Sequence, residues 1–198
     1  MRLADIAAEY GDQIRTVWLS FLLRPEPEPR PVDKFTEYTA KWATPGSLEP
    51  RARFNSWSGV NAPPSHSFPS ALAGKVAATF GGPARDAFSL RLFEAYFTEN
   101  RTISDRDVLL DVAAEAGLDR AEFDHRWRHD EDDLLQQVWG EYRLATQSGI
   151  QGVPAVVVNR RMVVSGAVEV DAYRDAIAQV LAAGPEGDDG ATGGDGEK

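Results

Sequence analysis

Apolar side chains recur every three to four residues along most of the chain, which is the spacing of one face of an α-helix. Breaks at Gly11, Gly81-Gly82 and Gly117 separate these stretches. Ser104 with Asp107 and Asp119 with Glu122 resemble helix-start signals. The pattern predicts helices over residues 3–10, 33–42 (ended by Pro45-Gly46), 67–80, 83–99, 104–116, 119–145 (with a break in the acidic stretch between Trp127 and Leu134) and 169–182.

Two regions depart from helical spacing. Ile14–Leu23 is a β-branched and aromatic run with apolar residues on both faces, which predicts a buried strand. Ala155–Val158 and Arg161–Val164 flank a turn at Asn159-Arg160 and predict an antiparallel hairpin. The order is then helix, strand, a block of helices, two strands and a helix. This order predicts an α/β fold whose small sheet carries a helical insertion.

Three segments lack either period. Residues 24–31 alternate prolines with charges and predict an extended connector. Residues 51–67 are rich in Pro, Ser, Asn and Gly but hold Phe54 and Trp57, so we expect an ordered loop. Residues 184–198 contain six glycines, five acids and one lysine, which predicts a disordered acidic tail.

The charge and the hydrophobicity of the chain argue against nucleic acid and membranes as partners. The chain has 21 basic and 31 acidic residues, a net charge of −10, so we expect no nucleic-acid partner. The apolar runs are far shorter than the roughly 20 residues of a membrane helix, and Asp5 and Glu9 interrupt the first of them. We therefore expect no membrane contact and a cytoplasmic location.

Cysteine is absent from all 198 residues, which removes disulfides, thiolate metal sites and cysteine nucleophiles from this chain. His125 and His129 lie four residues apart, with Glu122 and Asp133 near them, and could face a metal from one helix. Arginines intervene and no second motif supplies a further ligand. We favour a solvated helix surface and predict no metal site.

A set of short motifs carries a family resemblance. Gly152-Val153-Pro154 leads into a strand, a hairpin, Ser165-Gly166 and a final helix, which resembles the second half of a thioredoxin fold. The segments between them fall in the order found in DsbA-like thioredoxin proteins, namely Trp18–Leu23, Phe54 with Trp57, Pro64–Ser67, Ser70–Leu72, Leu92–Phe97, Ile103-Ser104, Val108-Leu109 and Ala116–Asp119. That family includes cytoplasmic dithiol oxidoreductases and 2-hydroxychromene-2-carboxylate isomerases. The resemblance covers residues 2–182.

The resemblance implies two binding surfaces. In the family the proline at the Pro154 position follows a cis peptide bond and faces the redox dithiol, and the backbone of Val153 would pair with an extended peptide or glutathione. Isomerase relatives have a polar turn beside the substrate pocket where this chain has Ser65, His66 and Ser67. The plainer interpretation of that turn is that Ser67 caps a helix.

The chain departs from the family at its N-terminus. The family begins with a strand and a turn that carries Cys-x-x-Cys or a serine replacement, whereas this sequence begins inside the helix that follows. We therefore expect a thioredoxin-like core without its first strand, formed by residues 1–23 and 150–183. Residues 24–149 would supply the linker, loop and helical insertion, and no catalytic residue would lie in this chain. We expect a fragment, or a start codon placed too late.

Three functions follow from the resemblance. The first is a thiol–disulfide oxidoreductase that acts on a small thiol or a protein disulfide, redox-inactive in this chain because the catalytic turn is missing. The second is a glutathione-dependent, isomerase-like relative, and glutathione is the one cofactor that the resemblance suggests. The third is a non-catalytic binding protein that keeps a thioredoxin cleft.

Overall fold

The computed structural model describes residues 2–49 and 51–184, and these form two compact units. The first unit comprises the described residues up to Thr16 together with those from Val153 onward. The second unit is Val17–Gly152. The acidic tail predicted for residues 184–198 lies, apart from Gly184, outside the described residues.

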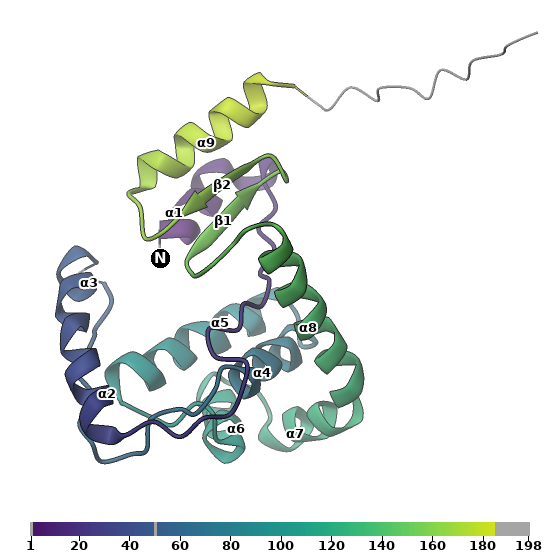
Figure 1. The fold of residues 1–198 in the computed structure, drawn as a ribbon. Helices are drawn as coiled ribbons and strands as arrows, with labels where there is room; N and C mark the ends of the chain where they lie inside the picture. Colours follow the sequence, from purple (N-terminus) through teal and green to yellow (C-terminus); the bar gives the residue numbers. More distant parts are fainter. Residues whose placement is uncertain (1, 50, 185–198) are drawn as a thin grey trace, which may run out of the picture. The chain divides into compact units, whose positions relative to one another are not determined.

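The first unit packs two helices with a hairpin (Figure 1). It consists of α1 (Arg2–Tyr10), the short 3₁₀ turn η1 (Gly11–Gln13), β1 (Ala155–Val158), β2 (Met162–Ser165) and α9 (Val170–Ala182). Its buried core is formed by Ile6 of α1 with Tyr173 and Ile177 of α9, and valines of the hairpin pack against them. Gly11 has a φ of +52° directly after α1, a backbone conformation that glycine adopts without steric cost.

The hairpin is confirmed, with its second strand one residue later than the sequence predicts. The strands are antiparallel, and the register places Ala155 opposite Ser165 and Val158 opposite Met162. Asn159 and Arg160 form the turn with φ values of +47° and +59°. Such paired left-handed residues suit a tight hairpin turn because their twist matches that of the strands.

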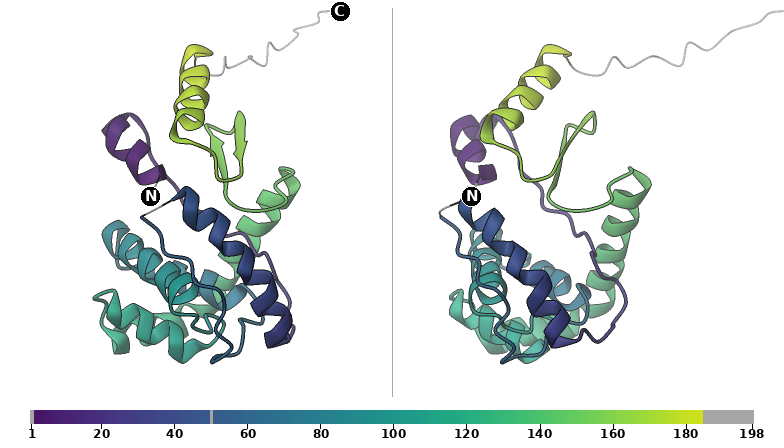
Figure 2. Two further views of the ribbon diagram at one scale, coloured as in Figure 1. Left: turned by 90° about the vertical axis from the view of Figure 1, so that its left-hand side faces the viewer. Right: turned by 60° about the vertical axis from the view of Figure 1, so that its left-hand side comes forward.

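The second unit is helical apart from its connecting segments (Figure 2). Its elements are α2 (Val32–Thr39), η2 (Ala40–Trp42), α3 (Ala43–Leu48), α4 (Phe68–Ala78), α5 (Gly82–Phe93), the π-helical turn η3 (Glu94–Thr98), α6 (Arg106–Glu115), α7 (Arg120–His129) and α8 (Glu131–Gln147). The α4 helix contacts α5, α6, α7 and α8, so its small residues Ala73 and Ala77 are fully buried. Phe88 and Phe123 stack at 5.6 Å between ring centroids and complete this core.

The sequence predicted the cap of α7 and the break before α8 correctly, but not the cap of α6. Asp119 caps α7 as the sequence indicates, because its carboxylate accepts the Glu122 N–H at 2.8 Å. At α6 the prediction was wrong by one residue: Asp105 rather than Ser104 is the cap, and it accepts the Asp107 N–H at 2.8 Å. Asp130 separates α7 from α8, which confirms the predicted break.

Pro45-Gly46 does not break the helix that precedes it, contrary to our prediction. Both residues lie inside α3, which continues from α2 and η2. Pro45 is the third residue of α3. The 3₁₀ turn η2 interrupts the α-helical hydrogen-bond ladder just before α3, so Pro45 lies in the first turn of a new α-helical segment, where a missing N–H costs little.

The predicted buried strand at Ile14–Leu23 is also wrong. This segment is extended at Ile14 but pairs with no strand among the described residues. Val17 and Leu19 are more than half exposed, whereas Leu22 is 1% exposed and joins the core of the second unit. A strand is defined by its pairing partner, and the apolar pattern that suggested burial carries no information about that partner.

A largely buried carboxylate holds this segment on the helices instead. Glu141 of α8 accepts the backbone N–H of Ser20 at 2.6 Å and the Lys75 ammonium of α4 at 2.6 Å. The side chains of Lys75 and Glu141 are only 11% and 13% exposed. One carboxylate therefore joins α4, α8 and the segment after Val17.

The loop between α3 and α4 is ordered, as predicted, and two buried polar side chains hold it. The Thr39 hydroxyl donates to the Thr36 carbonyl and accepts the N–H of Trp57, which is 1% exposed. Asn100, with a φ of +56°, accepts the Ser58 N–H at 2.7 Å through its side-chain oxygen. These bonds satisfy backbone groups that the loop buries without forming regular structure.

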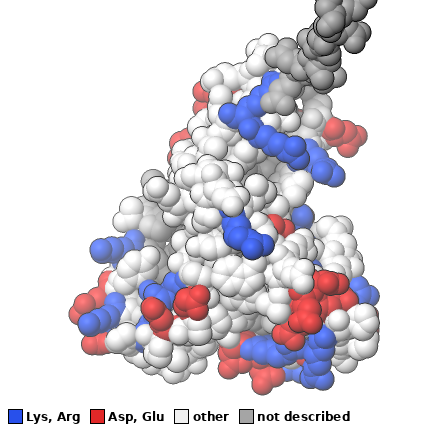
Figure 3. Space-filling model, turned by 45° about the vertical axis from the view of Figure 1, so that its right-hand side comes forward, with Lys and Arg blue, Asp and Glu red and all other residues white. Residues whose placement is uncertain are grey.

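Most surface arginines of the second unit lie beside carboxylates, and on the face shown in Figure 3 blue and red side chains are intermixed. Arg91 pairs with Glu99 and Glu115, and Arg101 with Glu115. No helix among the described residues has the length and apolar character that crossing a membrane requires.

Replacing Thr39 with valine should lower the free energy of unfolding by about 1–3 kcal/mol, because the buried Trp57 N–H then loses its acceptor. All five tryptophans lie in the second unit, so tryptophan fluorescence during urea unfolding measures that unit. Thr146→Val is the matched control, since Thr146 is exposed and its hydroxyl donates only within α8. Equal stability of the two variants would contradict the role given to Thr39.

Lys75→Met should cost about 3 kcal/mol of unfolding free energy, because Glu141, whose side chain is only 13% exposed, then loses its ion-pair partner. Arg120→Met removes an exposed pair with Asp111 and should cost less than about 1 kcal/mol. Urea unfolding followed by tryptophan fluorescence compares the two variants. A smaller loss for Lys75→Met than for Arg120→Met would show that Glu141 is not the anchor described above.

Candidate functional sites on two units

Val153 and Pro154 form the entrance to β1. The peptide bond between them is cis. The Pro154 carbonyl accepts the Gly166 N–H at 2.8 Å, which fixes this residue to the end of β2. Val153 is 51% exposed, and its backbone forms no hydrogen bond with the residues that the structure describes. An extended ligand could therefore use the N–H and C=O groups of Val153.

The free edge of β1 continues this surface. In an antiparallel pair, alternate residues direct their backbone groups toward the partner strand and away from it. The hydrogen bond from the Gly166 N–H to the Pro154 carbonyl fixes which residues of β1 direct their backbone groups toward β2. The N–H and C=O groups of Val156 point toward β2, whereas those of Ala155 and Val157 point outward. Among the described residues β1 pairs with β2 alone. Its outer edge is thus a row of backbone donors and acceptors.

Val163 occupies the equivalent position on β2. It lies directly opposite Val157, and the two side chains are 47% and 45% exposed. The register directs the Val163 N–H to the other edge of the hairpin. Val163 is therefore a matched reference for any ligand that uses the β1 edge.

Ser65, His66 and Ser67 lie before α4 in the second unit. The Ser65 hydroxyl lies 2.8 Å from His66 Nδ1, and the Ser65 N–H donates to the Ser104 hydroxyl at 3.1 Å. Ser67 is the first residue before α4, but its hydroxyl does not cap that helix. It accepts the backbone N–H of Arg24 at 3.1 Å instead, so the plain capping role suggested by the sequence is wrong.

The five residues suggested by the sequence thus form two surfaces. Val153 and Pro154 belong to the first unit, and Ser65–Ser67 belong to the second. The serine turn is engaged mainly in structural bonds, since Arg24 Nε also donates to the Ser65 carbonyl at 3.2 Å. The Val153 backbone has no such partner among the described residues, so the β1 edge is the stronger candidate for ligand binding.

The two histidines of α7 do not form a metal site in the described part of the chain. Their rings lie 6.0 Å apart, and His129 Nδ1 contacts the neighbouring Asp130 carboxylate at 2.6 Å. This carboxylate raises the pKa of His129 above its usual value. No group of three or more His, Cys, Asp or Glu residues in residues 2–49 and 51–184 is placed to hold a metal ion.

A cationic pocket in the second unit was not anticipated from the sequence. It has a volume of about 230 Å³ and is lined by Arg24, Glu28, Pro29, Arg30, Pro31, Lys34 and Phe35. The alternation of prolines and charges suggested only a connector. The signal that could have found the pocket is the basic residue at each end of the proline run, followed by Lys34.

Comparisons with known proteins agree with this architecture. A Bacillus subtilis (strain 168) protein, "Uncharacterized protein YwbO", is 27% identical over 173 residues, which are 85% of this chain and 83% of that protein. A solved Nitrosomonas europaea protein matches with a TM-score of 0.76 and 15% identity, covering 93% of this chain and 90% of its own. The cytosolic disulfide reductase DsbM from Pseudomonas aeruginosa, solved with GSH, gives a TM-score of 0.70 at 19% identity and covers 91% of both chains. The two solved structures share the fold.

The sequence profile described as "DSBA-like thioredoxin domain" matches residues 1–178. The match includes the hairpin, the Val153-Pro154 entrance and all helices of the described second unit. The helical unit, which lies between α1 and the hairpin in the sequence, is thus part of the domain. The chain belongs to the DSBA-like thioredoxin domain family.

Proposed function

We propose that this chain is the ligand-binding part of a DsbA-type thiol–disulfide oxidoreductase and that it has no dithiol activity by itself. Its ligand would be a small thiol such as glutathione, or an extended protein segment next to a disulfide. The ligand would bind as an added strand through the backbone of Val153, at the entrance to β1. Because the chain has no cysteine, the reacting thiols would come from outside its 198 residues.

One observation carries the proposal, namely the unpaired backbone beside Pro154. Val153 is half exposed, and its backbone forms no hydrogen bond with a described residue. The neighbouring Pro154 is held by the hydrogen bond from the Gly166 N–H to its carbonyl. A rigid strand entrance with open N–H and C=O groups can bind a peptide through main-chain hydrogen bonds. Such bonds do not depend on side-chain identity. This suits an enzyme family whose substrates share a disulfide rather than a sequence.

Glutathione is the ligand that the comparisons favour. DsbM, whose fold this chain shares, is named as a disulfide reductase and was solved with GSH. Glutathione is a short peptide-like molecule, so the same backbone pairing at Val153 would hold it. We also place the protein in the cytoplasm, and the cytosolic location in the name of DsbM supports this placement.

An isomerase-like relative that uses bound glutathione is the second candidate, and the lack of cysteine favours it. Such an enzyme needs the glutathione thiol as its reactive group and no thiol of its own. A non-catalytic binding protein with a thioredoxin cleft is the third candidate. Glutathione binding separates the second from the third, and redox turnover by a chain extended upstream to include the catalytic turn separates the first from both.

The 198-residue protein should not accelerate the reduction of insulin by dithiothreitol, because thiol–disulfide exchange requires an attacking thiolate and the chain supplies none. Turbidity of the released insulin B chain measures the rate, and thioredoxin is the positive control. A rate above the dithiothreitol background would contradict the proposal that the chain has no dithiol activity.

Glutathione should bind the 198-residue protein in isothermal titration calorimetry, and Val153→Pro should weaken that binding about tenfold, because proline removes the N–H donor. This substitution breaks no bond between described residues, so the fold should persist. Val163→Pro is the control: it also replaces an exposed valine, but at the opposite edge of the hairpin.

The outcomes separate the candidates. Loss of binding in Val153→Pro with binding intact in Val163→Pro supports the β1 edge as the site. Equal weakening by both variants would place the ligand elsewhere. No heat of binding with the unmodified protein would exclude glutathione as the ligand, and with it the isomerase-like candidate.

A further inference from the structure

A pocket in the second unit collects positive charge. It lies where the segment before α2 meets the first turn of that helix, and its volume is about 230 Å³. Three of its lining side chains are cationic, Arg24, Arg30 and Lys34, and one is a carboxylate, Glu28. Pro29, Pro31 and Phe35 complete the lining with apolar surface.

The single carboxylate is already engaged. Arg24 Nη2 contacts Glu28 Oε2 at 3.2 Å, and it lies 3.4 Å from the Glu28 carbonyl. Arg24 is held from its other side, since its Nε donates to the Ser65 carbonyl. The charges of Arg24 and Glu28 therefore balance each other, which leaves Arg30 and Lys34 as the excess cations of the pocket.

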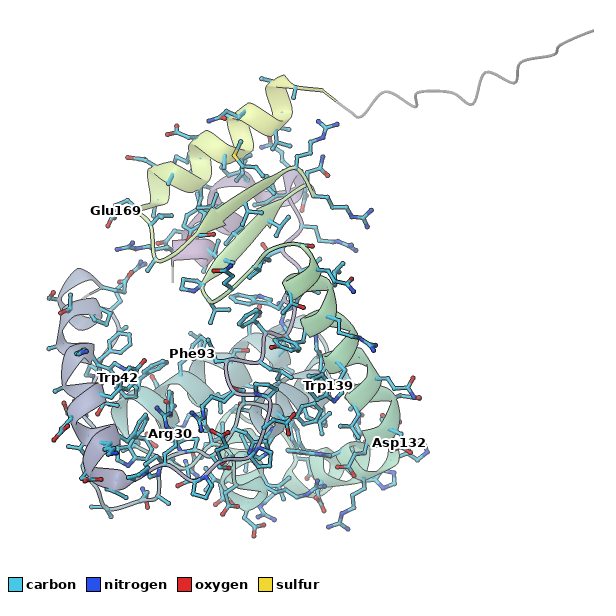
Figure 4. The ribbon with its side chains drawn as sticks, viewed as in Figure 1. Arg30, Trp42, Phe93, Asp132, Trp139 and Glu169 are labelled. Atoms are coloured by element: carbon cyan, nitrogen blue, oxygen red, sulfur yellow. The ribbon has the colours of Figure 1, made fainter. Side chains whose placement is uncertain are left out.

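Arg30 lies beside α2, as Figure 4 shows, and is half-buried. The guanidinium carbon of Arg30 stands 4.0 Å from the centre of the Phe35 ring. No carboxylate within the described residues forms an ion pair with Arg30 or with Lys34. Stacking of this kind fixes the plane of the guanidinium and leaves those of its N–H groups that do not bond with Tyr96 available to a planar anion.

Tyr96 contacts the Arg30 guanidinium but does not neutralise it. Burial raises the pKa of Tyr96 to about 12, and Arg30 opposes that rise only in part. The phenol is therefore neutral at pH 7. Burial also lowers the pKa of Arg30, as expected for a cation that is partly removed from water.

Arg30 differs from other arginines of this unit in its ion pairing. Arg91, Arg101 and Arg106 each pair with carboxylates at the surface. The chain has ten more acidic than basic residues, so a carboxylate is the usual neighbour of a cation here. A half-buried arginine that has no carboxylate partner in the described part of the chain and lies at the wall of a pocket is the arrangement of an anion-binding site.

We propose that this pocket binds the carboxylate or phosphate group of a small anionic molecule. Arg30 would hold two oxygens of the anion with its planar N–H groups, and Lys34 would add a second positive charge. Pro29 and Pro31, which are exposed, would contact the apolar part of the ligand. The proposal does not rest on the proposed function, because the β1 edge belongs to the other unit and no residue is shared.

The test is an NMR titration of the 198-residue protein with inorganic phosphate and, separately, with succinate, at an ionic strength held constant with sodium chloride. We expect saturable shifts of the Arg30 Nε–H and of the Lys34 and Phe35 amides with at least one of the two anions. The anion with the lower Kd identifies whether phosphate or carboxylate is the preferred group.

Two variants and two controls locate the site. Arg30→Gln should raise the Kd about tenfold, because it removes a charged pair of hydrogen-bond donors. Lys34→Gln should raise it about threefold, as expected for an exposed cation that acts by charge alone. Arg143→Gln and Lys41→Gln remove exposed cations of the same unit outside the pocket and should leave the Kd unchanged.

Several results would overturn the proposal. Shifts that rise linearly with both anions would show that no site exists. Equal weakening by Arg30→Gln and Arg143→Gln would show a general charge effect. Since Arg30→Gln also removes the stacking on Phe35, the Lys34→Gln variant decides the matter if Arg30→Gln fails to fold, and an unchanged Kd in Lys34→Gln would then refute the site.

Discussion

Backbone pairing along β1 is the constraint on which the candidate site depends. The bond from Gly166 to Pro154 sets which residues of β1 face β2 and which face outward. Once that phase is fixed, the outward groups of Ala155 and Val157 and the open backbone of Val153 follow from strand geometry. Each buried polar group needs a partner and each exposed one can take one. The edge is therefore suited to an extended ligand whatever side chains that ligand carries.

In the second unit, the backbone N–H and C=O groups find their hydrogen-bond partners in other ways. Its backbone groups are satisfied mostly within helices, and the irregular segments are tied down by a few buried polar side chains. Thr39 and Asn100 hold the loop around Trp57, and Glu141 holds the segment around Ser20. The oxygens of these side chains accept backbone N–H groups that a neighbouring strand would accept in a sheet. The unit can therefore carry long extended segments without leaving their buried groups unpaired.

Charge separates structural from candidate functional residues. Most cations of the helical unit are paired with carboxylates, and such exposed pairs contribute little beyond solubility. Arg30 differs because it is half-buried, stacked on Phe35 and without a carboxylate among the described residues. The two candidate surfaces also differ in kind. The β1 edge presents backbone groups, whereas the pocket at α2 presents side-chain charge.

The sequence by itself determined the features that arise from neighbours a few residues apart. These include the helices, the hairpin turn at Asn159-Arg160, the Asp119 cap and the lack of a thiol. The tertiary structure decided which groups find distant partners. Among the residues that the structure describes, the Ile14–Leu23 segment has no paired strand and Arg30 has no carboxylate partner, while the Ser67 hydroxyl accepts the Arg24 N–H. Helical spacing and caps act within one or two turns, whereas pairing and ion pairs join residues that only folding brings together.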